Sequence, residues 1–345
     1  MAKNQLALFT AVLIISLAFS GTTSAQTTTA GDKQGVYRLA IEGSEVAIYR
    51  NETLVTRLLT SNGSKPTLYP LIGPDQVPLT RAYPNEEPRE GEAEDHLHHR
   101  SVWFTHGEVN GIDFWAEGEG KGKIVQKQLR IVTGDEDFSI HTANDWQAPD
   151  GHVVLTDQRQ IRFQEILGLQ AIDFQIALQA RDQAVVFGDT KEGSFGIRVN
   201  EHMKVDAKEG GRIVNSEGDL DGQAWGKPAA WVDYSGPVSA PAEQAVDADA
   251  ADASADATPI YGIAVMNHPS SFAFPTRWHV RTYGLFAANP FGVHHFTGGS
   301  PTEGVRLEPG KTIELKYRLL LHRGRAEDAA IAKHWEIYAG GADPN

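Results

Sequence analysis

Several segments of the chain alternate apolar and polar residues with a period of two, and this is the sequence feature that most restricts the possible folds. The alternation is clearest in residues 45–50, 172–178 and 312–321, with Gly, Pro, Asn and Asp between the runs. Successive side chains of a strand point to opposite faces, so the pattern is typical of antiparallel sheets that bury one face. Helical spacing occurs only in residues 326–338. We therefore expect an all-β fold, a large antiparallel β-sandwich with a short C-terminal helix.

The composition excludes several classes of function. The chain has 345 residues and a formal net charge of -14, and no cluster of Lys and Arg suits a nucleic-acid backbone. Cysteine is absent, which excludes disulfides, cysteine-ligated metals and a thiol nucleophile. No glycine-rich phosphate-binding motif stands between a strand and a helix. The chemistry must therefore rest on His, carboxylates, Arg, Lys or hydroxyl groups.

The N-terminus is typical of a secretory signal. Lys3 precedes an apolar run from Leu6 to Phe19, and Thr23-Ser24-Ala25 provides a small-residue cleavage site. The run is shorter than the roughly 20 residues that span a bilayer. We expect cleavage after Ala25 (signal peptide 1–25), a secreted or periplasmic protein, and a single β-sandwich domain over residues 26–345. No later segment is apolar enough to span a membrane, so no transmembrane partner is implied.

One segment inside the domain has a different composition. Residues 237–259 read PVSAPAEQAVDADAADASADATP, with many Ala and Asp and no aromatic residue. Such a segment cannot bury apolar surface, so we expect a solvated loop. A helix is the alternative, because Ala favours helix while Asp and Ser oppose it. Strand-like residues on both sides indicate the tip of a long hairpin.

The densest polar cluster is DHLHHRSVWFTHG, residues 95–107. If residues 97–104 form a strand, His96, His98 and Arg100 share one face, and His99, Ser101 and Trp103 share the other. Two His at positions i and i+2 can converge on one substrate or one metal ion. Three readings stay open: an acid/base site, a divalent-metal site formed by His96, His98 and His106, and a polar rim with satisfied hydrogen bonds.

Two tryptophans flank this cluster. An exposed indole face of Trp103 or Trp115 would be a platform for a sugar ring, and the alternative is that both indoles lie in the core. Asp113 lies between them in sequence and could orient a His or accept a hydrogen bond from a sugar hydroxyl.

Two more segments carry charged side chains. In GDTKEGSFGIRV, residues 188–199, Asp189, Lys191 and Glu192 provide a general base or an ion pair, or else a solvated turn. In WHVRTYGLFAANPFG, residues 278–292, His279 and Arg281 share a strand face while Trp278 points the opposite way. The Arg281 fork suits a carboxylate or a polarised oxygen. We expect these remote segments to converge on one site.

The motifs HLHHRSVWFTHGEVNGIDFW, GDTKEGSFGIRV and WHVRTYGLFAANPFG resemble the PmoA-like family, secreted bacterial proteins often labelled "methane oxygenase PmoA". The resemblance runs over residues 36–338 and implies carbohydrate substrates. The all-β character is also similar to the galactose-mutarotase-like supersandwich, in which His and a carboxylate transfer protons on a sugar ring. The family motifs place on the site His98, His99, Arg100, Asp189, Lys191, Glu192, His279, Arg281 and Asn289. The sequence departs from the family pattern in the Ala/Asp insertion and at Thr282.

The sequence thus predicts a secreted enzyme that acts on a sugar or modified sugar by His/carboxylate acid/base chemistry, as an epimerase, lyase or hydrolase. We expect His98 or His279 as acid or base, Glu192 or Asp189 as its carboxylate partner, and Arg100 and Arg281 on a substrate oxygen. The expected substrate-binding residues are Trp103, Asp113, Trp115, Trp278 and Asn289. A non-catalytic carbohydrate-binding protein and a His-liganded metal-dependent hydrolase or lyase are the alternatives. No cofactor is certain, and the oligomeric state is left open.

Overall fold

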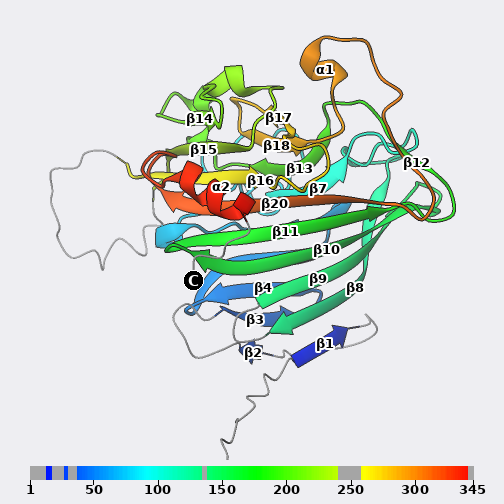
Figure 1. The fold of residues 1–345 in the computed structure, drawn as a ribbon. Helices are drawn as coiled ribbons and strands as arrows, with labels where there is room; N and C mark the ends of the chain where they lie inside the picture. The colour runs from blue at the N-terminus through cyan, green and yellow to red at the C-terminus, as the bar shows by residue number, and fades with distance from the viewer. Residues whose placement is uncertain (1–12, 18–26, 30–36, 134–137, 240–257, 341–345) are drawn as a thin grey trace, which may run out of the picture.

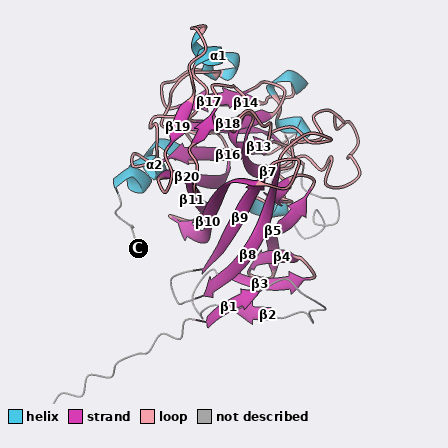
Figure 2. Cartoon of the chain, turned by 90° about the vertical axis from the view of Figure 1, so that its right-hand side faces the viewer, coloured by secondary structure: helices cyan, strands magenta, loops and turns pink. Residues whose placement is uncertain are grey.

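The computed structural model describes residues 13–17, 27–29, 37–133, 138–239 and 258–340. Two nine-stranded antiparallel sheets form its body, and the helices lie at the periphery (Figures 1 and 2). The expected antiparallel β-sandwich with a short C-terminal helix is confirmed.

The first sheet, sheet A, has the strand order β1-β8-β9-β10-β11-β20-β16-β15-β14. Its strands are β1 (Leu13–Leu17), β8 (Lys123–Thr133), β9 (Phe138–Gln147), β10 (Val153–Ile166), β11 (Leu169–Gln179), β20 (Thr312–Arg323), β16 (Ile260–Asn267), β15 (Trp231–Pro237) and β14 (Arg212–Asn215).

The second sheet, sheet B, has the order β17-β18-β13-β7-β6-β5-β4-β3-β2. Its strands are β17 (Arg277–Val280), β18 (Leu285–Asn289), β13 (Gly193–Arg198), β7 (Val102–His106), β6 (Lys65–Leu68), β5 (Thr53–Asn62), β4 (Glu45–Arg50), β3 (Tyr37–Glu42) and β2 (Thr27–Thr29). A separate pair joins β12 (Val185–Phe187) and β19 (Val305–Leu307). The helical elements are η1 (Pro74–Gln76), η2 (Glu201–Met203), η3 (Val205–Ala207), η4 (Asp221–Ala224), α1 (His294–Thr297) and α2 (Ile331–Gly340).

The main apolar core collects side chains from both sheets. Phe104, Phe195 and Trp278 of sheet B belong to the same buried cluster as Phe174 and Leu319 of sheet A. Because side chains alternate along each strand, the neighbours of the sheet B residues lie on its outer face, away from this core.

That outer face carries a row of side chains across four strands. Trp103 of β7 pairs with Gly196 of β13, Gly196 with Ala287 of β18, and Ala287 with His279 of β17. Residues directly opposite each other in a ladder share a face. A Cβ at position 196 would lie 2.6 Å from Cε2 and Cζ2 of Trp103, so glycine lets the indole lie across β13. This row is the floor of the site described below.

The C-terminal helix begins later than the sequence pattern predicts. Residues 326–330 form turns, and Ala330 has a φ of 49°, so α2 starts only at Ile331. Its Trp335 and Tyr338 pack on a second buried cluster that includes Leu320 of β20. Figure 1 shows α2 lying against β20 and β16.

The two ends of the Ala/Asp segment are adjacent in sheet A. Pro237 pairs with Ile260 at the end of the β15–β16 pair where the segment connects the two strands, and residues 240–257 lie outside the described residues. Most of the expected signal, residues 1–12 and 18–26, also lies outside them, while β1 pairs with β8. Cleavage after Ala25 therefore stays a prediction. Within the part of the chain that the structure describes, no helix is long and apolar enough to cross a membrane.

Candidate acid–base site

The His-rich segment is a turn, and the predicted strand over residues 97–104 is wrong. Strand β7 begins only at Val102, and the backbone N–H of His99 donates to the carbonyl of His96 over 2.8 Å. The φ angles of His96 and Ser101 are 45° and 61°, values that a pleated strand does not accommodate. The expected division of these side chains between two strand faces therefore does not apply.

The turn stacks aromatic rings in a column on the outer face of sheet B. His96 lies nearly parallel to Tyr283, with ring centroids 5.4 Å apart, and to His99 at 4.7 Å. His99 stacks in turn on Trp103 at 5.3 Å. We call Tyr283, His96, His99 and Trp103 the aromatic column. Tyr283 follows β17, so the column joins the His-rich turn to the segment that contains His279.

Asp95 holds His96 in place. Its Oδ2 lies 2.7 Å from Nδ1 of His96, while its Oδ1 accepts hydrogen bonds from Arg198 at 2.9 Å and from Arg81. Burial by itself would raise the pKa of Asp95, but Arg198, Arg81 and His96 together lower it to about 2. The His96 side chain is 42% exposed, and its Nε2 makes no hydrogen bond to a described residue. The arrangement is a permanent carboxylate that orients an accessible imidazole.

His98 and His99 are neutral at ordinary pH. Burial lowers the pKa of His98 to about 4, with the charge of Lys65 adding to the effect. Burial also places the pKa of His99 well below its ordinary value. The Nδ1 atom of His99 is buried with no hydrogen-bond partner among the described residues.

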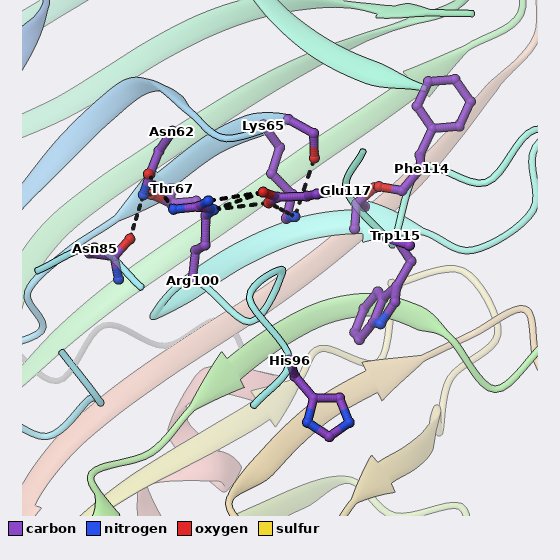
Figure 3. A network of polar contacts seen from close by, with 12 residues as sticks. Asn62, Lys65, Thr67, Asn85, His96, Arg100, Phe114, Trp115 and Glu117 are labelled. Atoms are coloured by element: carbon purple, nitrogen blue, oxygen red, sulfur yellow. Dashed lines mark hydrogen bonds and ion pairs between the residues drawn. The ribbon is translucent and has the colours of Figure 1, made fainter. Parts of the chain in front are cut away.

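Arg100 belongs to a structural network, which corrects its expected role on a substrate oxygen. Its Nε and Nη2 donate to the two carboxylate oxygens of Glu117, each over 2.9 Å, and its Nη1 donates to Asn62 over 3.0 Å. Lys65, fully buried, donates to the same carboxylate over 3.0 Å (Figure 3). Arg100 and Lys65 lower the pKa of Glu117 although burial opposes them. Glu117 was not predicted from the sequence.

The three tryptophans expected to bind substrate are all buried. Trp103 and Trp115 are only 2% and 3% exposed and pack edge to face, with centroids 5.4 Å apart. Trp278 lies fully inside the main core. Of the two alternatives for Trp103 and Trp115, the buried one is confirmed: the small residues Gly196 and Ala287 let both indoles form a satellite core on the outer face.

His279 is the second histidine of the site, and it is only 3% exposed. Its Nδ1 donates to the carbonyl of Lys191 over 2.8 Å, which fixes the tautomer and leaves Nε2 as an acceptor without a described partner. Burial lowers the pKa of His279 to about 3, and the charge of Arg281 adds to this, while the bond to Lys191 opposes it.

Arg281 connects His279 with the aromatic column. Its guanidinium carbon lies 5.6 Å from the ring of Tyr283 and 5.9 Å from that of Trp225, and Trp225 meets His279 edge to face. Burial raises the pKa of Tyr283, which therefore keeps its phenolic proton. The half-exposed Lys191 and Glu192 lie beside this group, with Nζ and Oε1 3.6 Å apart.

Four predicted site residues instead hold loops. Asp189 accepts hydrogen bonds from the backbone of Val293, His294 and Thr302, so it is no free general base. Asn289 donates to the carbonyls of Thr190 and Lys191.

Asp113 accepts hydrogen bonds from the backbone of Trp115 and Ala116 and forms an ion pair with Lys121. His106 donates to the carbonyl of Gly188 over 2.8 Å.

The structure does not bring together His96, His98 and His106, the three residues of the alternative metal site. His106 lies on the core side of β7 against Phe187 and Phe291, whereas His96 and His98 lie in the loop on the outer side. Among the described residues, no three His, Asp or Glu side chains are grouped to hold a metal ion.

The site therefore brings together His96, His98, His99, His279, Arg281, Lys191 and Glu192, as the sequence predicted in part, and adds Asp95, Arg198, Trp225 and Tyr283. Residues 37–336 match the model of a family of unknown function, DUF6807. The chain belongs to this family. The match does not support the PmoA-like label, and no curated protein matches the chain.

Solved structures resemble this DUF6807 protein only distantly. A glycoside hydrolase family 97 enzyme from Pseudoalteromonas sp. strain K8, in complex with panose, is 10% identical with a TM-score of 0.30, over 86% of this chain and 34% of that one. The DUF6807 chain thus spans about a third of that enzyme. A putative aldose 1-epimerase from Escherichia coli K12 is 11% identical with a TM-score of 0.33, over 87% of this chain and 100% of that one.

Proposed function

We propose that this protein is an enzyme that acts on a carbohydrate or modified sugar by general acid/base chemistry. The observation that carries the proposal is the Asp95–His96 pair, with 2.7 Å between Oδ2 and Nδ1 and a partly exposed imidazole beside the aromatic column. Within this proposal His96 moves the proton, in place of His98 or His279, the two residues expected from the sequence.

Asp95 and His96 have different roles in the proposed proton transfer: Asp95 orients the imidazole, and His96 carries the proton. The anionic carboxylate keeps the proton on Nδ1, so the lone pair of Nε2 points away from Asp95 and can take a proton from substrate. When His96 becomes an imidazolium, the same carboxylate stabilises its charge. Arg81 and Arg198 keep Asp95 ionised and fixed, so they are positioning residues.

The groups around His96 suit a ligand with many hydroxyls. The neutral imidazole of His98 offers one donor and one acceptor, and Tyr283 offers a phenolic donor. His279 offers only Nε2 as an acceptor, because its Nδ1 already donates to the carbonyl of Lys191. Arg281 makes no ion pair with a described residue, and its fork can hold a carbonyl, hydroxyl or carboxylate oxygen of the substrate. Glu192 is a second partly exposed carboxylate of the site besides Asp95, and we assign it as the second proton-transfer group.

The test is turnover of a panel of aldoses, uronic acids and glycosides by the purified protein and two variants, His96→Gln and Asp95→Asn. We expect both variants to lose turnover by about 10²–10⁴-fold while their far-UV circular dichroism is unchanged. The matched control is His152→Gln, which removes an exposed imidazole 3.8 Å from Asp150 and should leave turnover unchanged. Full activity of His96→Gln on a substrate that the wild type converts would overturn the proposal.

A non-catalytic carbohydrate-binding protein is the second candidate, and one observation favours it. The pKa values of His98 and His279 lie at about 4 and about 3, so these imidazoles act as hydrogen-bonding groups rather than proton-transfer groups at neutral pH. Calorimetric binding of a sugar without product, with an affinity that is constant between about pH 5 and 8, would select this candidate.

A further inference from the structure

An open trough of about 810 Å³ lies on the outer face of sheet A and takes no part in the site described above. It crosses the adjacent strands β8, β9, β10, β11 and β20, which Figure 1 shows side by side. The acid–base site lies on the outer face of sheet B, so the two surfaces belong to different sheets.

Two rows of polar side chains line the trough. Residues that pair directly across an antiparallel sheet share one face, and the ladder register therefore defines each row. The first row is Gln128, Ala143, Gln158, Ala177 and Glu314; the second is Arg130, His141, Gln160, Gln175 and Lys316.

Residue size explains why this face is hollowed. Ala143 and Ala177 alternate with longer side chains in the first row, so they leave room between their neighbours. At the β20 end, Tyr338 of α2 packs over Arg318 at 4.4 Å, two residues along the strand from Lys316. The helix therefore lies beside the β20 end of the trough.

The charge of the trough is opposite to that of the whole protein. The chain carries -14, yet Lys127, Arg130 and Lys316 face this surface against a single carboxylate, Glu314. Lys127 is the extra residue of a β-bulge between Gln126 and Gln128, so it stays exposed next to Gln128. Neither Lys127 nor Arg130 forms an ion pair with a described residue. The remaining cation of the lining, Arg159, points inward to Asp157 at 2.8 Å.

We propose that this trough binds a segment of an acidic polysaccharide. Its cations match carboxylate or sulfate groups, and the carboxamides of Gln128, Gln158, Gln160 and Gln175 can both donate to and accept from ring hydroxyls. Five strands span about 19 Å at the usual spacing, which suits a chain rather than one sugar unit. The described residues of the lining include no tryptophan, tyrosine or phenylalanine, so recognition rests on hydrogen bonds and charge.

The same lining argues against an acidic peptide. A peptide docked on a sheet face gains its specificity from pockets for side chains, and the two rows present only polar groups and Ala. The proposal is also independent of the acid–base site, because no residue of the trough belongs to it. A protein with such a surface would stay attached to an anionic glycan whether or not it converts that glycan.

The experiment measures binding of polygalacturonate to the full chain by calorimetry at low and high salt. Dextran is the neutral control and poly-L-glutamate the acidic-peptide control. We expect the wild type to bind polygalacturonate, to weaken as salt rises, and to bind neither control polymer. The variant Lys127→Ala/Arg130→Ala/Lys316→Ala should lose at least tenfold in affinity with an unchanged melting temperature.

Two further variants make the result specific. Lys208→Ala/Lys227→Ala/Arg306→Ala removes three exposed cations outside sheet A and should bind as the wild type does. Gln158→Ala/Gln160→Ala should weaken binding several-fold without changing the salt dependence. The proposal is overturned if polygalacturonate does not bind, if both triple variants lose affinity equally, or if poly-L-glutamate binds as well. His96→Gln should bind normally, so the two proposals can fail separately.

Discussion

Nε2 of His322 lies 2.7 Å from Oδ2 of Asp233, and both side chains are completely buried in sheet A. The two residues belong to β20 and β15, on either side of β16. A Cβ on Gly262 of β16 would lie 2.3 Å from Cε1 of His322, so glycine makes the room for this pair. Burial lowers the pKa of His322, but the charge and hydrogen bond of Asp233 outweigh it and raise the pKa above its ordinary value.

This pair predicts how stability depends on alkaline pH. Because the pKa of His322 is higher in the folded than in the unfolded state, its contribution is complete below the unfolded value of about 6.5 and disappears as pH rises through the folded value. We expect His322→Gln to lower the free energy of unfolding most at pH 5.5 and least at pH 9. Urea denaturation at several pH values measures this. A difference that grows with pH would contradict the assignment.

Acidification should destabilise the protein through a different set of histidines. Burial lowers the pKa of His106 to about 4, although its bond to Gly188 opposes this, and burial also lowers the pKa values of His98 and His279. The unfolded chain therefore binds protons first, and stability is lost as pH falls from about 6.5 toward 4. His106→Gln should make this decline shallower. Histidine NMR titrations check the cause, since midpoints near 6.5 for these three rings would refute it.

The network of Lys65, Arg100 and Glu117 should be sensitive to loss of its carboxylate. Glu117→Gln leaves the fully buried Lys65 without a counter-charge and removes both ionic bonds of Arg100. Breaking a buried ion pair in this way costs about 3–5 kcal/mol of unfolding free energy. Glu119→Gln, an exposed change two residues along the same loop, should cost less than about 0.5 kcal/mol. Equal urea midpoints for the two variants would show that the network contributes little.

The strands could be predicted from the sequence because their signal is local. Large apolar residues occupy every second position of residues 172–178 and 313–319, and these residues lie within β11 and β20, which pair over ten residues. The His-rich turn was mistaken for a strand because the apolar residues of β7 directly follow it. The positive φ angles of His96 and Ser101, which break the pleat, leave no mark on the hydrophobic pattern.

The site was predicted only in part because its roles depend on distant residues. Asp95 stands next to His96 in sequence, but its anionic state depends on Arg81 and on Arg198, 103 positions away. Nothing in the sequence around Tyr283 indicates that it belongs to the site, because its contact with His96 arises only when the His-rich turn packs on sheet B. A carboxylate directly before a His cluster is the signal that could have indicated the pair.

We expect a substitution of Gly196 to affect both the stability of the fold and the geometry of the candidate site. A methyl group there would lie 2.6 Å from two ring atoms of Trp103, closer than van der Waals contact allows. Trp103 is buried against Trp115 and His99, so its indole cannot move without displacing the aromatic column. We expect Gly196→Ala to cost about 1–3 kcal/mol, as overpacking does, and to shift the tryptophan emission.

The matched control is Gly222→Ala, because a Cβ at position 222 meets no atom within 4 Å and should leave stability nearly unchanged. If the column transmits the strain to His96, Gly196→Ala also lowers turnover or sugar binding at temperatures where it remains folded. Urea denaturation and tryptophan fluorescence measure the first effect, and the substrate panel measures the second. If Gly196→Ala has the same tryptophan emission and stability as the wild type, Trp103 has room to move. The aromatic column would then not be a rigid support that positions His96.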